Sequence, residues 1–266
     1  MTIREWIRDR EIRGKTMFTL ADLRKDFSQR SEQAVLNTLS RLKRERVLYS
    51  PYSSFYVALP PQYILRGAVP AYYYMDSLMG KLGRDYYFGL LSAAVLWGAA
   101  HQRPQTDFVV TTRPALSSRA TAKRRIEWVY RSAVPRRFLC EKNSEAGRVV
   151  YSCAELTALD LVQFERHSGG LSVAATVLGE LLEATDFGNA ADGLFRTCSM
   201  AAVQRLGYIV EAVLGDAKRG AAIHREWRKC NRAVRHVALS PRAPARGRRD
   251  DRWKVVVNAE IEADET

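Results

Sequence analysis

The sequence has few cysteines, and the four that occur are scattered along the chain, as Cys140, Cys153, Cys198 and Cys230. This spacing excludes the closely paired cysteines of a zinc ribbon or of a thioredoxin-like redox motif. It also gives no support for a disulfide framework. We therefore expect four free thiols in a reducing compartment.

Long hydrophobic runs are also missing. No stretch approaches the roughly 20 apolar residues that a membrane-spanning helix needs. The first residues, MTIREWIRDREIRG, are charged throughout and contain no signal-peptide core. These absences predict a cytoplasmic protein without a membrane partner.

The sequence contains no recognisable catalytic motif. The glycine pairs in MGKLG and HSGGL lack the strand-to-helix context of a phosphate-binding loop, and no GxSxG motif occurs. Glu141-Lys142 resembles the end of a nuclease motif, but the upstream acid at a strand end is missing, with Asp107 the nearest candidate. Asp160 lies within an apolar helical pattern, where capping or pairing with an arginine is the simpler role. We expect no enzymatic activity, no cofactor and no metal site.

Positive charge is what the sequence has in excess. Its 42 basic and 29 acidic side chains give a formal charge of +13 and a pI near 9.8, which favours a polyanionic partner such as nucleic acid. The excess is concentrated in residues 113–142, with a net charge of +7, and in residues 216–254, with a net charge of +9. The length of 266 residues and a hydrophobic content of 47% predict one large or two ordinary globular domains.

Residues 19–58 have the pattern of a winged helix-turn-helix. Thr19 and Asp22 have capping-box spacing, which predicts a helix over 20–27, and Ser31 is placed to cap a second helix after a turn at 28–30. Two β-rich runs, 47–49 and 55–57, follow that helix and predict a wing. In the winged variant the second helix enters the DNA major groove.

The second helix has two different faces. Val35, Leu39 and Leu42 form an apolar stripe, and the opposite face carries Gln33, Asn37, Arg41 and Arg44. Amide side chains can pair with adenine edges, and arginine with guanine or phosphate. The alternative is a small helical domain whose polar face is merely solvated.

The whole chain reads as α+β, with the winged domain followed by a larger mixed α/β domain. We expect boundaries of 1–59 for the DNA-binding domain, 60–74 for a linker whose tyrosines pack the domains together, and 75–266 for the second domain. Within the second domain we expect a central helix over 85–101 and strands over 107–112, 126–131, 136–139 and 148–152. Helices should follow over 154–164, 170–184 and 201–215. The rest should be a Pro/Arg-rich loop over 240–252 and a last strand over 253–261 that rejoins the sheet.

A second basic surface is predicted between two of these strands. The loop from Arg113 to Arg125 is rich in arginine and lysine, and we expect it either to contact phosphate or to be ordinary solvated surface. The candidate residues of this patch are Arg113, Arg119, Lys123, Arg124 and Arg125.

The second domain resembles the AbiEi family. The resemblance is carried by the collinear blocks YYFGLLSAAVLWGAAHQRPQ, ELTALDLVQF, GGLSVAATVLGEL, AVQRLGYIVE and WKVVVNAEIEAD behind a winged helix-turn-helix. It implies an antitoxin of a type IV toxin–antitoxin, abortive-infection (phage-defence) system, whose partner is a nucleotidyltransferase-like toxin. Family members repress their own operon by binding inverted repeats in its promoter. Carried onto this chain, the DNA-reading positions are Gln29, Arg30, Ser31, Gln33, Asn37 and Arg41, and the wing contacts are Tyr52, Ser53 and Ser54.

Two other functions are compatible with the sequence. One is a stand-alone winged-helix regulator whose C-terminal domain senses a ligand or protein partner, and the other is an enzyme, such as a decayed nuclease. Because no long heptad helix is available for dimerisation, we expect a monomer in solution that pairs on double-stranded DNA.

Overall fold

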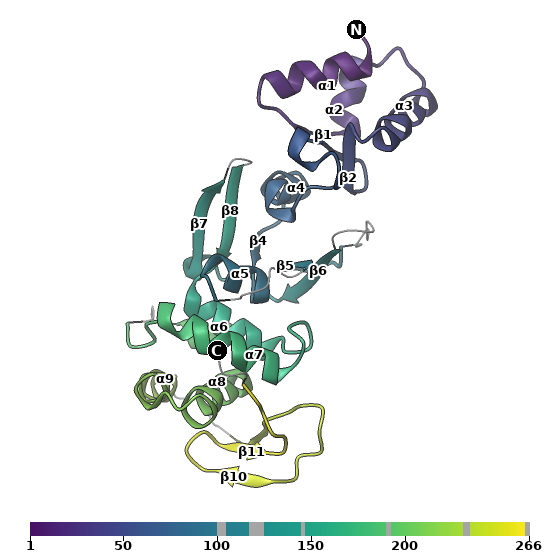
Figure 1. Ribbon diagram of the computed structural model, residues 1–266. Coiled ribbons are helices and arrows are strands. Elements are labelled where there is room, and N and C mark those ends of the chain that lie inside the picture. The colour runs from purple at the N-terminus through teal and green to yellow at the C-terminus, as the bar shows by residue number, and fades with distance from the viewer. Residues whose placement is uncertain (100–104, 117–124, 145–146, 190–192, 231–234, 264–266) are drawn as a thin grey trace.

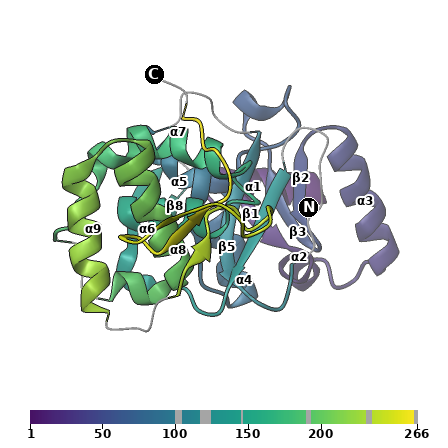
Figure 2. The same ribbon diagram turned by 90° about the horizontal axis from the view of Figure 1, so that it is seen from below.

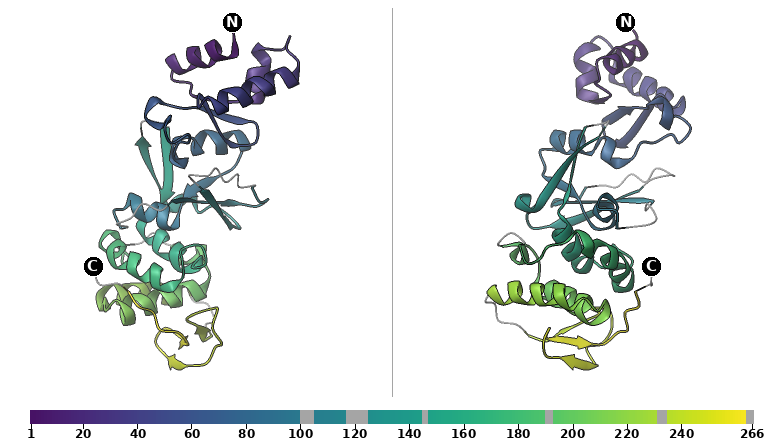
Figure 3. Two further views of the ribbon diagram at one scale, coloured as in Figure 1. Left: turned by 45° about the vertical axis from the view of Figure 1, so that its right-hand side comes forward. Right: turned by 60° about the vertical axis from the view of Figure 1, so that its left-hand side comes forward.

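The computed structural model describes residues 1–99, 105–116, 125–144, 147–189, 193–230 and 235–263. The molecule is elongated, with the N-terminal helices at one end and the last strands at the other (Figures 1 and 3). A mixed sheet and a layer of helices lie between these ends. The α+β architecture predicted from the sequence is confirmed.

The N-terminal end is a winged helix-turn-helix. Its elements are α1 (Ile3–Ile12), β1 (Met17–Thr19), α2 (Leu20–Asp26), α3 (Glu32–Arg44), β2 (Leu48–Tyr52) and β3 (Phe55–Ala58), and the strands pair in the order β1-β3-β2. The predicted capping box is present, since the Thr19 hydroxyl accepts from the Asp22 N–H and the Asp22 carboxylate accepts from the Thr19 N–H. The predicted helices and the second wing strand form within about one residue of their expected ends, whereas β2 continues to Tyr52, three residues beyond the predicted run 47–49.

A five-stranded sheet forms the middle of the molecule. Its strands are β4 (Tyr86–Phe88), β5 (Thr106–Thr112), β6 (Arg125–Arg131), β7 (Leu139–Ser144) and β8 (Gly147–Ser152), in the order β6-β5-β4-β8-β7. The pairs β5–β6 and β4–β8 are parallel, and the other two are antiparallel. Helix α4 (Met75–Leu82) precedes the sheet and ends at Gly83, whose φ of 64° is the left-handed conformation of a helix C-cap.

The predicted central helix over 85–101 is wrong in its first part and in residues 97–99, which follow the end of the helix. Tyr86, Tyr87 and Phe88 form β4, and the helix α5 (Leu90–Leu96) begins only after Gly89. A continuous apolar run has no period that separates a buried strand from a buried helix, so the sequence pattern could not place this break. A Cβ at Gly89 would lie 2.8 Å from the Val110 side chain, which explains why glycine stands at the change of direction.

The predicted strand over 136–139 is also wrong. Arg136–Phe138 form a 3₁₀ turn, closed by a hydrogen bond from the Phe138 N–H to the Pro135 carbonyl, and β7 begins at Leu139. The other short 3₁₀ segments are Pro61–Tyr63, Ala71–Tyr73, Leu182–Ala184 and Leu194–Thr197. The β7 strand then continues to Ser144, through residues that the sequence pattern assigned to a turn.

Helices cover one side of the sheet and continue the long axis of the molecule. They are α6 (Ala154–Gln163), α7 (Leu171–Leu181), α8 (Met200–Tyr208), which continues as a π-helical turn over Ile209–Val213, and α9 (Ala217–Lys229). The helices predicted over 154–164, 170–184 and 201–215 are confirmed, whereas α9 was not predicted. No helix within the described ranges combines the length and the apolar character that a membrane crossing requires.

The last strand does not return to the central sheet, so that prediction is wrong. The strands β9 (Val237–Ala238), β10 (Arg248–Asp250) and β11 (Val255–Val257) form a separate sheet in the order β10-β11-β9. The Gln204 amide on α8 donates to the carbonyls of Trp253 and Lys254 at 3.2 and 2.9 Å and so holds the start of β11 against α8. Seen from below, these strands cross the end of the molecule beside α9 (Figure 2). The strand β10 lies within the predicted Pro/Arg-rich loop.

Candidate nucleic-acid interface

Helix α3 presents one face to a core and the other to solvent. Its N-terminus is capped by Ser31, whose hydroxyl accepts a hydrogen bond from the Ala34 N–H at 3.3 Å. Val35, Leu39 and Leu42 are at most 1% exposed and pack in a small core with residues of α1, α2 and the wing. Because the apolar stripe is anchored in this way, the polar face of α3 points away from the protein.

The exposed face of α3 carries the four side chains that the sequence pattern placed there: Gln33, Asn37, Arg41 and Arg44. The Gln33 amide donates to Asn37 Oδ1 at 2.9 Å, which orients both amides. Arg41 lies 3.8 Å from Glu45, a loose and exposed pair that costs little to exchange for a phosphate or a base. The face therefore combines oriented amides, suited to adenine, with arginines suited to guanine or phosphate.

The turn before α3 supplies the three further predicted positions. Gln29, Arg30 and Ser31 are all exposed, and the Arg30 guanidinium lies over the Phe27 ring at 5.4 Å. The Ser31 hydroxyl is already used as the helix cap. Of these three side chains, Gln29 and Arg30 are exposed and take no part in the helix cap.

The tip of the wing is small. Ser53 and Ser54 are exposed, and the Ser54 carbonyl accepts from the Leu20 N–H at 2.9 Å, which fixes the tip beside the start of α2. Tyr52 is half-buried and packs against the larger core of the protein. Two exposed serines without a basic side chain can make only neutral contacts to a phosphate backbone.

The strands of the wing are buried on both faces, which the sequence pattern did not reveal. Leu48, Tyr56 and Ala58 belong to the small core under α3. Tyr49 and Phe55, on the other face, contact the Tyr74 ring at centroid distances of 6.1 and 6.4 Å and belong to the larger core. The wing therefore joins the helix-turn-helix to the rest of the chain, and the expected packing role of the linker tyrosines is seen in Tyr74.

Only part of the predicted second patch lies within the described residues. Arg113 is exposed and lies over the Tyr130 ring at 5.7 Å, and Arg125 is paired with Glu127 at 3.1 Å. The remaining three positions, Arg119, Lys123 and Arg124, lie outside the described residues.

Asp160, which lies within an apolar helical pattern of the sequence, has charged and polar partners in the structure. The Asp160 carboxylate pairs with Arg131 and accepts from the Tyr87 hydroxyl at 2.7 Å. Burial raises the pKa of Asp160 to about 6, against the opposing effects of the Arg131 charge and of the hydrogen bonds from Tyr87 and Arg131. The predicted pairing of Asp160 with an arginine is confirmed.

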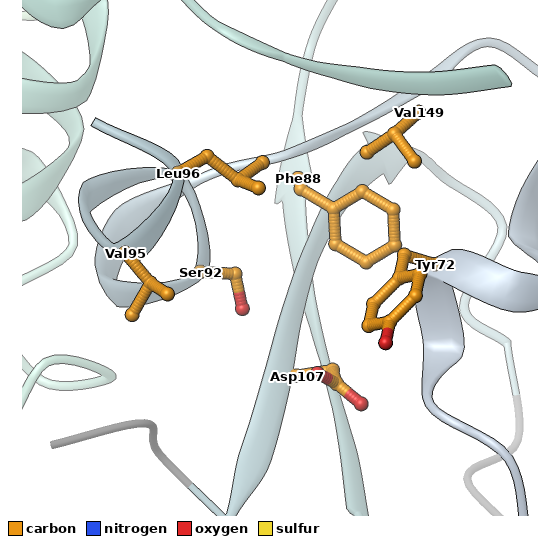
Figure 4. A pocket seen from close by; sticks show the side chains of 7 residues that line it. All are labelled: Tyr72, Phe88, Ser92, Val95, Leu96, Asp107 and Val149. Atoms are coloured by element: carbon orange, nitrogen blue, oxygen red, sulfur yellow. The ribbon is translucent and has the colours of Figure 1, made fainter. Parts of the chain in front are cut away.

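Asp107 lines a small pocket of about 30 Å³ (Figure 4). Its carboxylate accepts from the Ala71 N–H at 3.2 Å, and Ser92 in the same pocket accepts from the Phe108 N–H. The pocket is about the size of one water molecule. Within the described ranges, no three His, Cys, Asp or Glu side chains converge in a way that could hold a metal ion.

A larger groove of about 590 Å³ runs between α4 and the β7–β8 hairpin. Most of its charged side chains are paired with one another, and Arg84 donates to the carbonyls of Thr112 and Pro114. Arg136 forms three hydrogen bonds to the Asp85 carboxylate, at 2.9, 2.7 and 2.6 Å, and Arg148 lies between Glu141 and Asp76, at 3.0 and 3.2 Å. The groove is polar, but its own ion pairs compensate its charge.

Comparison with known proteins supports the architecture described above. No curated protein matches the chain. Among solved structures, the crystal structure of the RV2827C protein from Mycobacterium tuberculosis is similar, with a TM-score of 0.64 and 14% sequence identity over 95% of this chain and 89% of that chain. At this level of identity the likeness shows a shared fold.

The family comparison concerns the middle of the chain. Residues 87–212 match the AbiEi antitoxin C-terminal domain. This segment contains most of the central sheet and extends through α5, α6, α7 and α8. The middle of the chain is therefore similar to the antitoxin domain of the AbiEi family.

Proposed function

We propose that this protein is the antitoxin of a type IV toxin–antitoxin system, that it neutralises a nucleotidyltransferase-like toxin, and that it represses its own operon. In this proposal residues 1–59 read inverted repeats in the promoter, residues 60–74 link the two parts, and residues 75–266 provide the antitoxin function. The protein acts in the cytoplasm by binding, without catalysis. In the alternative, a stand-alone regulator, the first domain would bind DNA in the same way, but the protein would have no toxin partner.

The exposed face of α3 is the observation that supports DNA reading. Its four polar side chains project from a helix whose other face is locked into a core by Val35, Leu39 and Leu42. A recognition helix must be rigidly placed if its side chains are to select bases, because specificity depends on hydrogen-bond geometry. With Gln29 and Arg30 at its start, this surface offers groups for both base edges and phosphates.

The wing adds little to this surface, and we assign it a positioning role. Its buried strands fix the angle between α3 and the antitoxin domain. Ser53 and Ser54, beside the start of α2, contact the DNA backbone. The loop that contains Arg113, Arg119, Lys123, Arg124 and Arg125 is a further proposed phosphate contact. Two monomers would bind the two halves of an inverted repeat, with half-site centres about 34–36 Å or a multiple apart.

DNase footprinting on the protein's own upstream region, at two salt concentrations, tests the repressor function. Protection of two inverted half-sites, with weak binding to unrelated DNA, supports the proposal. Uniform coverage that disappears with salt would contradict it, since this result would mean that the charge binds DNA without reading it.

Co-expression tests the antitoxin function. The reading frame adjacent to this one should encode a nucleotidyltransferase-like protein that arrests growth when it is expressed alone. Full-length antitoxin should restore growth, and a variant with Asn37→Ala and Arg41→Ala should still do so, because neutralisation is assigned to the other domain. A toxin that stays active beside a folded, abundant antitoxin would contradict this part of the proposal.

A further inference from the structure

Three arginines lie close together in the sequence at and just before β10. Arg248 and Arg249 lie on β10, which is an edge strand of its sheet, and Arg246 precedes them. All three are exposed, and none has an ion-pair partner among the residues that the structure describes. Nearby arginines differ, since Arg242 lies 3.5 Å from Glu165 and Arg252 lies 2.9 Å from Glu211.

The loop that carries these arginines into β10 is firmly held by one side chain. The Asn258 amide donates to the carbonyls of Ser240, Ala243 and Pro244 at 2.9, 3.0 and 3.1 Å, and its oxygen accepts from the Ser240 N–H at 2.8 Å. The amide NH2 group has two donor hydrogens, which are shared among these three carbonyls, so both hydrogens are used in holding the loop. The segment therefore has a defined backbone despite its Pro/Arg-rich sequence.

Close packing fixes the arginine segment against β11. A Cβ on Gly247 would lie 2.0 Å from the Val257 carbonyl oxygen, so only glycine allows this approach. Arg248 and Arg249 then pair in antiparallel register with Val257 and Val256. Because side chains alternate along a strand, the two arginines flank the free edge on opposite faces.

We propose that Arg246, Arg248 and Arg249 form a further DNA-binding surface, separate from α3 and from the Arg113–Arg125 loop, which holds the phosphate backbone of a duplex independently of its sequence. Arginine binds phosphate with a planar, bidentate geometry, and an exposed arginine without a carboxylate partner breaks no ion pair when it does so. The fixed loop reduces the entropy lost on binding. The surrounding segment, residues 216–254, has 13 basic and four acidic side chains, which adds long-range attraction.

The position of this surface gives it a separate role. It lies at the end of the molecule opposite α3 (Figures 1 and 3) and outside residues 87–212, which match the antitoxin domain. A single copy bound to its operator through α3 can therefore hold a second stretch of DNA at its other end. Because it needs no base reading, this contact goes beyond the proposed repressor function and does not depend on it.

The test compares two full-length triple variants with equal loss of charge. One is Arg246→Ser/Arg248→Ser/Arg249→Ser, and the control is Arg66→Ser/Lys142→Ser/Arg196→Ser, at three exposed basic positions elsewhere. Fluorescence anisotropy measures binding to a labelled duplex of unrelated sequence over a series of salt concentrations. The slope of log K against log salt should become shallower by about 2–3 in the first variant, because each phosphate contact contributes about 0.9, and by less than 1 in the control.

A third variant, with lysine at the same three positions, should keep most of the salt slope because it keeps the charge. The ratio of operator affinity to unrelated-DNA affinity should rise in the serine variant, since only the non-specific contact is removed. Equal shifts in both serine variants would overturn the proposal, as would no shift in either. Unchanged DNA binding together with loss of toxin neutralisation would overturn it in favour of a protein partner.

Discussion

Arg131 on β6 and Asp160 on α6 form an ion pair that is shielded from solvent, with their side chains 3% and 0% exposed. Arg131 also donates to the Tyr87 hydroxyl at 3.0 Å, and that hydroxyl donates to Asp160. The second Nη of Arg131 donates to the Thr197 carbonyl, in the segment before α8. One network therefore ties two strands of the sheet to the helical layer inside the antitoxin domain.

Replacing only one residue of this ion pair should markedly lower the free energy of unfolding. Arg131→Met or Asp160→Asn leaves the other charge buried without its partner, and either variant should lose about 3–5 kcal/mol in free energy of unfolding. Urea unfolding followed by circular dichroism measures the loss. The double variant Arg131→Met/Asp160→Asn should lose less than the sum of the two single changes, because no uncompensated charge remains.

An exposed pair in the same domain serves as the control. Arg136 and Asp85 are 75% and 45% exposed, so Arg136→Ser should cost about 0–1 kcal/mol. A cost for Arg131→Met in that same low range would contradict the buried network.

Two glycines offer a matched test of how the C-terminal sheet packs on the helices. A Cβ on Gly207 in α8 would lie 1.9 Å from the Trp253 ring, whereas Gly179 in α7 is helical and exposed, with nothing within 4 Å. Gly207→Ala should therefore destabilise the protein by about 1–3 kcal/mol through overpacking. Gly179→Ala should stabilise it by up to about 1 kcal/mol, because alanine is the better helix former. Thermal unfolding measures the change in Tm of each variant. Changes of the same sign in the two variants would contradict this packing.

Asp22 gives the helix-turn-helix a stabilising contribution that depends on pH. Burial alone would raise the pKa of Asp22, but hydrogen bonds from the Thr19 N–H and hydroxyl, and the Lys81 charge 3.5 Å away, outweigh it and lower the pKa below the ordinary value of 3.8. The ionised native form is thus favoured, so the contribution is present above pH 3.8 and is lost as the pH falls through the native pKa.

Asp22→Asn should consequently reduce the free energy of unfolding at pH 6 and have a much smaller effect at pH 3. Urea unfolding at both pH values measures the difference between the variant and the original protein. An effect of equal size at both pH values would mean that the carboxylate charge does not contribute. Lys25→Gln, which changes an exposed charge on the same helix, is the control and should show no such dependence.

Local patterns were sufficient to predict the helix-turn-helix. The stripe of Val35, Leu39 and Leu42 fixed which face of α3 is buried, and Thr19 and Ser31 marked the starts of α2 and α3. These features depend on residues a few positions apart, so the sequence displays them directly. The same patterns placed the candidate DNA-reading side chains, because the exposed face is the complement of the buried one.

Features that depend on distant partners could not be predicted in the same way. The pattern around Asp160 suggested an arginine partner, but not that Arg131, 29 residues away, would be the one. The strand 255–257 was expected, but its pairing with β9 and β10 in a separate sheet was not. Both wing strands were predicted, the first of them too short, yet their burial on both faces depends on Tyr74, which lies in the linker.

The DNA-reading proposal makes its sharpest prediction at two residues of α3 with different chemistry. Asn37 is an amide oriented by Gln33, and Arg44 is an exposed charge near the end of the helix. Asn37→Ala should weaken operator binding by about 1–3 kcal/mol and leave binding to unrelated DNA almost unchanged, as expected for a direct base contact. Arg44→Ala should weaken both to a similar extent and reduce the salt slope by about 1, as expected for a phosphate contact. Anisotropy titrations of both variants on operator and unrelated duplexes separate these outcomes. If Asn37→Ala caused equal losses on the two duplexes, α3 would hold DNA without reading it, and sequence recognition would have to come from another element.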